Sequence, residues 1–218
     1  AGTKHRDTYN LMGALSWELY KGIALGSKVD FTAANAAKYK DLRHKTKLMN
    51  LALTTGVYVP LQSVSLGFNY TYRRNTESVV FSTYASNAQE FSSYINYGPW
   101  IGKTEQFSSS GFTDSNREQP MLNEYHGLGL QFSWNILPNL SWFNNFGGTY
   151  RKGYYGRKSP YTIVHSDHHS NIYDYQSRLS LTLDKQIHHL DFSFSSENLV
   201  NEMNAYRSNK NEQGAYFY

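Results

Sequence analysis

The residues best suited to chemistry lie in one short stretch, HSDHH at 165–169. Imidazoles beside a carboxylate can ligate a transition metal or form a dyad that activates water. However, the spacing of His165, Asp167 and His168 matches no standard metal signature, and a loop that enters a strand often carries solvated polar residues. We therefore predict no metal, cofactor or catalytic site. A membrane-embedded hydrolase that uses these residues is the enzyme hypothesis left open.

A second candidate site is the long segment 76–124, which is rich in aromatic residues and includes Tyr94, Tyr97 and Trp100. Connections of this length are uncommon and often functional. Exposed rings would suit stacking on a glycan or docking of a surface protein. The interpretation that we favour is that the segment folds over itself, extends a hairpin and buries those rings.

Charged residues of both signs share the polar side of the alternating stretches described next. They are Lys28, Asp30, Arg73, Asp174 and Arg178. If this side lines a water-filled interior, the charges either create a transverse field that selects permeants or pair and plug a narrow interior. The sequence leaves both interpretations open.

The elements that position these residues alternate with a period of two. From Val64 to Tyr72 every second residue is apolar, the pattern of a strand with one apolar face. Seven further stretches behave similarly, least clearly at 140–151, and none has a convincing helical period. The sequence predicts an all-β, antiparallel up-and-down meander of about eight long strands, at 8–20, 23–34, 47–59, 63–74, 125–136, 140–151, 171–184 and 188–197.

Short and long connections alternate strictly between these strands. Tight turns are expected at 21–22, 60–63, 137–139 and 184–186, and long connections at 35–46, 76–124, 152–170 and after 198. Every second connection of a meander lies at the same end of the sheet. One end therefore carries turns and the other large loops, as in outer-membrane barrels.

Composition favours a transmembrane barrel over a soluble one. Charged residues are 17% of the chain, below the roughly 25% usual in soluble domains. No apolar run approaches the ~18 residues of a membrane helix, whereas each strand has the ~9–11 residues of a membrane strand. Aromatic residues gather near strand ends, with Trp17, Tyr58, Trp134 and Trp142 by the turns. A soluble β-barrel or lectin-like glycan-binding module, which also alternates, is the alternative.

We accordingly expect an integral outer-membrane protein, either a passive channel or an envelope component, and not an enzyme. Basic residues between Lys38 and Lys47 would face lipopolysaccharide, and no basic stripe for nucleic acid occurs. If the tight turns are periplasmic, the first strand would begin outside the cell and the eighth strand would finish there. This predicts that residues 1–218 are a single segment from the middle of a larger barrel, with unpaired edges and a wet interior.

Five stretches, at 25–45, 56–61, 70–81, 119–127 and 153–170, resemble an uncharacterised Bacteroidota family of outer-membrane β-barrels, classed only as a domain of unknown function. The likeness spans most of the chain and lies in loops and strand ends. It implies a larger barrel in a Gram-negative outer membrane with no established activity. It assigns a function to no residue.

Overall fold

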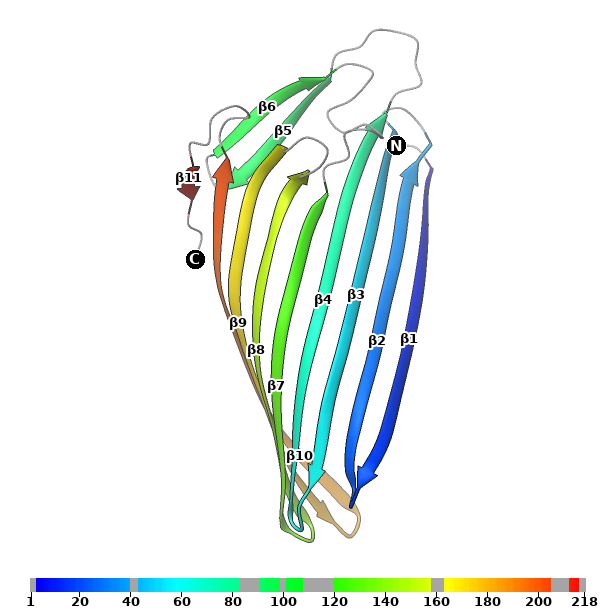
Figure 1. The fold of residues 1–218 in the computed structure, drawn as a ribbon, viewed down its shortest axis with the longest axis vertical. Helices are drawn as coiled ribbons and strands as arrows, with labels where there is room; N and C mark the ends of the chain where they lie inside the picture. The colour runs from blue at the N-terminus through cyan, green and yellow to red at the C-terminus, as the bar shows by residue number, and fades with distance from the viewer. Residues whose placement is uncertain are drawn as a thin grey trace.

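The computed structural model describes residues 3–39, 43–82, 91–98, 101–107, 120–157, 163–204 and 212–215. The eight strands predicted from the sequence form one antiparallel meander (Figure 1): β1 (Lys4–Tyr20), β2 (Ile23–Lys38), β3 (Arg43–Pro60), β4 (Val64–Ser82), β7 (Met121–Leu137), β8 (Leu140–Arg157), β9 (Ile163–Leu183) and β10 (Gln186–Asn204). In these described ranges no helix is long and apolar enough to cross a membrane.

Three shorter strands complete the described structure. β5 (Phe91–Gly98) and β6 (Ile101–Phe107) form a separate two-stranded sheet, and β11 (Glu212–Ala215) pairs with the last four residues of β10. β4 pairs directly with β7 although the β5–β6 hairpin lies between them in sequence. The hairpin is therefore an insertion at the end of the sheet and does not interrupt the meander.

The sheet is open. Over the described residues, β1 pairs only with β2, and no ladder joins β1 to β10. Figure 1 shows a curved, tapering wall with the tight turns gathered at one end, while β1 begins and β10 finishes at the opposite end. The prediction of an unclosed sheet is confirmed, and such a sheet is consistent with an incomplete barrel. β1 is an unpaired edge, whereas β10 pairs with β11 over its last four residues and is unpaired along the rest of its outer side among the described residues.

The strands are longer than the sequence pattern indicated, from 16 residues in β2 to 21 in β9. Most of the connections predicted at 35–46 and 152–170 is strand, and both ends of the predicted loop 76–124 belong to β4 and β7. The prediction of these loop bounds was wrong for a physical reason. Beyond the apolar part of the sheet both faces carry polar residues, so the alternation that reveals a strand disappears although the strand continues.

The pairing register places most of the apolar residues of the eight strands on one face. One row across the sheet contains only apolar and aromatic residues: Trp17, Leu25, Val57, Phe68, Leu130, Phe146, Tyr175 and Phe194. The next row, one residue along each strand, is small and polar: Ser16, Gly26, Gly56, Asn69, Gly129, Gly147, Asp174 and Ser195. A slip of one residue in any pair would mix the two faces.

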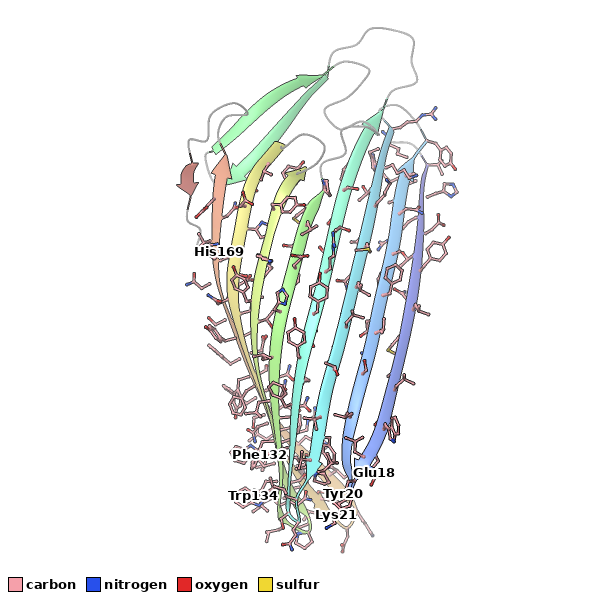
Figure 2. All side chains as sticks on the ribbon, in the orientation of Figure 1. Glu18, Tyr20, Lys21, Phe132, Trp134 and His169 are labelled. Carbon is pink, nitrogen blue, oxygen red and sulfur yellow. The ribbon has the colours of Figure 1, made fainter. Side chains whose placement is uncertain are left out.

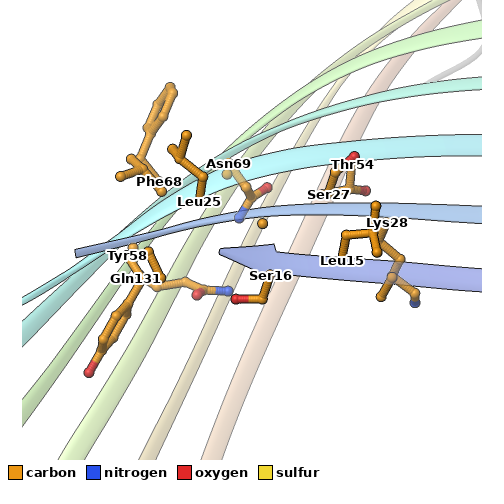
Figure 3. Close-up of a pocket in the computed structure, with 16 residues that line it drawn as sticks. Leu15, Ser16, Leu25, Ser27, Lys28, Thr54, Tyr58, Phe68, Asn69 and Gln131 are labelled. Carbon is orange, nitrogen blue, oxygen red and sulfur yellow. The ribbon is translucent and has the colours of Figure 1, made fainter. Parts of the chain in front are cut away.

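The polar face is the inside of the curve. On the apolar face, a Cβ added at Gly13 or Gly148 would meet nothing within 4 Å. On the polar face, a Cβ at Gly56 would lie 2.8 Å from the carbonyl oxygen of Phe68, and one at Gly129 would lie 2.7 Å from the amide of Asn69. Side chains thus converge on the polar face and diverge on the apolar one. Figure 3 shows the two sets on opposite sides of the sheet, Leu25 and Phe68 on one side and Ser16 and Gln131 on the other.

Candidate functional site

The outer face carries a continuous apolar band, which we define by its boundary rows. One boundary is the row that contains Trp134 and Trp142, and the other is the row that contains Tyr72, His126 and Tyr150. The band therefore covers 126–134 on β7 and 142–150 on β8, nine residues on each strand. Nine residues extend about 30 Å along a strand, or about 23 Å when the strand is tilted by ~40°, close to the ~25 Å band of membrane barrels.

Indole groups form the boundary nearer the tight turns. Trp134 and Trp142 are direct cross-strand partners. Trp142 Nε1 donates a hydrogen bond of 2.8 Å to Ser177 Oγ, and its ring meets Phe132 edge-on at 6.4 Å between centroids. Phe132 and Trp134 lie near the turn end of the sheet, whereas His169 lies toward the other end (Figure 2). Rings with one apolar and one polar side suit a membrane interface.

Tyrosine and histidine form the opposite boundary. The Tyr70 hydroxyl and His126 Nδ1 are 2.7 Å apart, and the Tyr72 hydroxyl donates to Glu124 Oε1 at 3.2 Å. The next row outward is charged and contains Arg74, Glu124, Lys152 and His169. Lys152 Nζ lies 3.8 Å from Glu124 Oε2. The apolar band thus changes to a charged surface within one row.

Polar groups inside the band are held by neighbouring aromatic residues. Asn144 is only 2% exposed, and its Oδ1 accepts a hydrogen bond of 2.8 Å from the Tyr175 hydroxyl. This explains the blurred alternation at 140–151, because Asn144 shares its face with Trp142 and Phe146, as predicted. Tyr58 was wrongly placed in the aromatic boundary. It pairs with Ala24 and Gly67 on the polar face.

The large side chains of the band have little protein around them. Trp17 is 75% exposed, Phe192 58% and Leu128 55%. The band also includes the exposed side chains Leu25, Leu53, Phe68, Leu130, Phe146, Tyr173, Leu190 and Phe194. Soluble monomers rarely expose apolar patches larger than a few hundred Å². A surface of this extent requires lipid or another protein to cover it.

The inner face contains a polar groove of about 470 Å³ across β4, β7, β8 and β9, which we call the interior groove. Its lining is Asn69, Thr71, Arg73, Tyr125, Gly127, Leu128, Gly129, Gln131, Asn145, Gly147, Thr149, Ile172, Asp174 and Gln176. Arg73 Nε donates to Asn50 Oδ1 at 2.7 Å, and the guanidinium lies 5.0 Å from the centre of the Tyr125 ring. Asp174 accepts a 2.7 Å hydrogen bond from the Ser195 hydroxyl.

The predicted interior charges divide into two groups. Lys28 Nζ lies 2.7 Å from Asp30 Oδ2 on the same strand, and Arg178 Nε lies 2.6 Å from Asp191 Oδ1 on the next strand. These pairs are exposed and local, within one strand for Lys28 and Asp30 and between neighbouring strands for Arg178 and Asp191. Within the described ranges Arg73 and Asp174 have no ion-pair partner, and both line the interior groove.

Arg151 belongs to the same arrangement and was missed in the sequence. It stands in the row of Arg73 and Tyr125, with its guanidinium 6.0 Å from the centre of the Tyr125 ring. Arg151 Nη2 pairs with Glu197 Oε1 at 3.3 Å. Residue 151 is the last of the predicted strand 140–151, and counting by twos from Phe143, which lies opposite Arg178, places Arg151 on the inner face.

The HSDHH stretch is part of β9 and not a loop, which corrects its predicted setting. Strand alternation directs Asp167 and His168 to opposite faces, so they cannot act as a dyad. His168 lies beyond the apolar band, and its Nε2 is 2.6 Å from Asn123 Oδ1. Burial, followed by the nearby Arg151 charge, lowers the His168 pKa. Within the described residues no group of three His, Asp or Glu side chains can hold a metal ion, and the His165 side chain lies outside them.

The described structure does not test the predicted binding role of the aromatic side chains in segment 76–124. The backbone of Tyr94 and Tyr97 belongs to β5, and Tyr94 pairs with Thr104 of β6. The side chains of both tyrosines, and all of Trp100, lie outside the described residues. Their role in binding a glycan or a surface protein stays a prediction.

Two glycines of β8 should respond very differently to alanine. A Cβ at Gly153 would collide with the carbonyl oxygen of Leu122 and with His168 Nε2, and would lie 2.9 Å from Asn123 Oδ1, whereas a Cβ at Gly148 meets nothing within 4 Å. Gly153→Ala should lower the free energy of unfolding by roughly 1–3 kcal/mol, as overpacking does. Gly148→Ala should change it by less than about 0.5 kcal/mol. Urea titration in detergent measures both, and equal losses would contradict the crowded inner face.

A family model described as "Family of unknown function (DUF6850)" matches residues 1–217 of the chain. No curated protein and no solved structure matches the chain. The match covers nearly the whole sheet and assigns no activity.

Proposed function

Because the chain belongs to a family whose function is unknown, DUF6850, we propose a function from geometry: the sheet is part of the wall of an outer-membrane β-barrel that acts as a passive channel. The apolar band faces lipid and the polar face lines a water-filled interior. The proposal includes no catalytic step.

The single observation that supports this proposal best is the height and continuity of the apolar band. It crosses all eight strands of the meander, is nine residues tall on β7 and β8, and has indoles at one boundary and tyrosines at the other. A protein partner would require no particular height and no aromatic boundaries. A bilayer requires both.

The inner face supports a wet interior. It contains Gly26, Gly56, Gly129 and Gly147 in one row, and the amide of Asn69 lies against Gly129. Because such side chains lie flat against glycines, they project little from the inner face of the sheet. A thin polar wall leaves room for water and solutes, whereas a narrow packed barrel needs large side chains inside.

Basic residues on the outward face beyond the tyrosine boundary support the view that this end of the sheet lies at the cell surface. Arg74, Lys152 and, further along β3, Lys47 share the outward face there. Such cations would contact the phosphates of lipopolysaccharide. The location in a Gram-negative outer membrane of the Bacteroidota type follows from the resemblance described above and belongs to the proposal.

Fractionation of cells that produce the protein tests the location. We expect recovery in the outer-membrane fraction, resistance to extraction by alkaline carbonate, and release by detergent, because the apolar band would otherwise meet water. Recovery in the aqueous fraction without detergent would overturn the barrel. A channel additionally requires ion conductance when the purified protein is added to a planar bilayer, and a membrane-inserted protein without conductance would reduce the proposal to an envelope component.

A further inference from the structure

We infer that the interior groove binds a polyhydroxylated, uncharged solute, a saccharide of one or two rings. The inference deepens the proposed function and rests on it to the extent that the groove must face the water-filled interior. It concerns a site separate from the aromatic segment 76–124.

Glycines form the floor of the interior groove, and the Asn69 amide lies over one of them, Gly129. Gly127 and Gly129 are buried in the middle of the groove, with Gly147 beside them on the next strand. A Cβ at Gly127 would lie 3.0 Å from Thr149 Oγ1, so larger residues are disfavoured on this floor. The volume of about 470 Å³ lies within the ~300–1,000 Å³ typical of small-molecule sites.

A row of amides forms one side of the groove. Gln131, Asn145 and Gln176 are neighbours on three adjacent strands. In the part of the chain that the structure describes, their side-chain amides have no hydrogen-bond partner within the protein. Each amide offers both a donor and an acceptor, and a hydroxyl group needs both. The hydroxyls of Thr71 and Thr149 lie on the other side of the glycine floor.

The two unpaired charges favour an uncharged ligand. Arg73 and Asp174 stand three strands apart, on β4 and β9, and four residues apart along the strands, so their Cα atoms are roughly 19 Å apart. Arg73 uses only Nε for Asn50, so its terminal nitrogens can donate to hydroxyl groups. Asp174 accepts hydrogen bonds from hydroxyls but repels an anion. A neutral polyol can hydrogen-bond with either group, whereas a phosphate is repelled by Asp174 and a cation by Arg73.

Isothermal titration of the purified full-length protein in detergent, with maltose as the probe, tests the site. We expect binding that Asp174→Asn and Gln131→Ala each weaken at least 10-fold. The matched controls are Arg178→Gln and Asp191→Asn, charged residues on the same inner face outside the groove, which should change the affinity less than 2-fold. Sodium phosphate should give no binding heat.

Three results would overturn the inference: no maltose binding by the folded protein, equal weakening by the control variants, or binding of phosphate in place of maltose. Far-ultraviolet circular dichroism of each variant shows that it is folded. A protein that conducts ions but fails these binding tests refutes the groove and leaves the channel intact. A protein that binds maltose but fractionates with water-soluble proteins refutes the barrel and leaves the groove intact.

Discussion

Phe192→Arg is expected to prevent most of the protein from assembling in the membrane, whereas Ser193→Arg should leave assembly largely unchanged. The two residues are consecutive on β10 and therefore lie on opposite faces. Phe192 belongs to the apolar band and is 58% exposed. A cation on the lipid side at mid-depth costs roughly 2–4 kcal/mol, but a cation on the inner face meets water. The amount of folded, heat-modifiable protein in the outer-membrane fraction measures the difference.

A second pair on β3 repeats this test away from the edge of the sheet. Leu53 faces outward in the row of Val29 and Tyr72, while Thr54 faces inward and its hydroxyl lies 2.9 Å from that of Thr71. Because this row is the tyrosine boundary of the band, where a cation costs only about 0–1 kcal/mol, Leu53→Arg should impair assembly less than Phe192→Arg but still more than Thr54→Arg. Equal damage from both would mean that the interior is packed and not wet. Greater damage from Thr54→Arg and Ser193→Arg would reverse the assignment of the two faces.

Cross-linking should separate the continuous part of the sheet from its open edges. The chain has no cysteine, so introduced thiols report only on the chosen positions. Tyr70 and Leu128 are direct partners between β4 and β7, and their Cβ atoms are expected about 4.5–5.5 Å apart. A Tyr70→Cys, Leu128→Cys double variant should be joined almost completely by a thiol reagent that spans about 8 Å, which is longer than that separation.

The same reagent should leave the two edges unjoined within one molecule. Leu15 on β1 and Ser196 on β10 stand in one row at opposite sides of the sheet. In a membrane, the free backbone groups of both edges must pair with other strands. We therefore expect no intramolecular product from Leu15→Cys, Ser196→Cys. An efficient intramolecular cross-link would show that β1 meets β10 and would refute the open sheet.

The sequence by itself determined which residues form the meander and which way they face. Leu66, Phe68 and Tyr70 alternate with small and polar residues, and the structure places all three on the apolar face. Even Asn144, an apparent error in the pattern, was assigned to the correct face of β8. The physical reason is that successive side chains of a strand point to opposite sides, so facing is a local property that needs no knowledge of the partners.

The sequence did not predict the outer ends of the strands, where apolar and polar residues no longer alternate. The outer ends of β4, β8 and β9 continue through residues that no longer alternate between apolar and polar, because both faces there lie beyond the apolar band. Backbone hydrogen bonds to neighbouring strands hold these ends in the sheet, and such bonds depend little on side-chain type. For this reason the sequence predicts a loop at HSDHH and groups His168 with Asp167, whereas in β9 these two side chains point to opposite faces.

Only the tertiary structure decided which side chains meet across strands. Arg73, Tyr125 and Arg151 come together because β4 pairs with β7 and skips the β5–β6 hairpin, a pairing between residues far apart in sequence. The same register joins Arg178 to Asp191 and leaves Arg73 and Asp174 facing the interior groove without ionic partners among the described residues. A period of two fixes the face of each residue but not its height relative to another strand, and that height is set by pairing along the whole sheet.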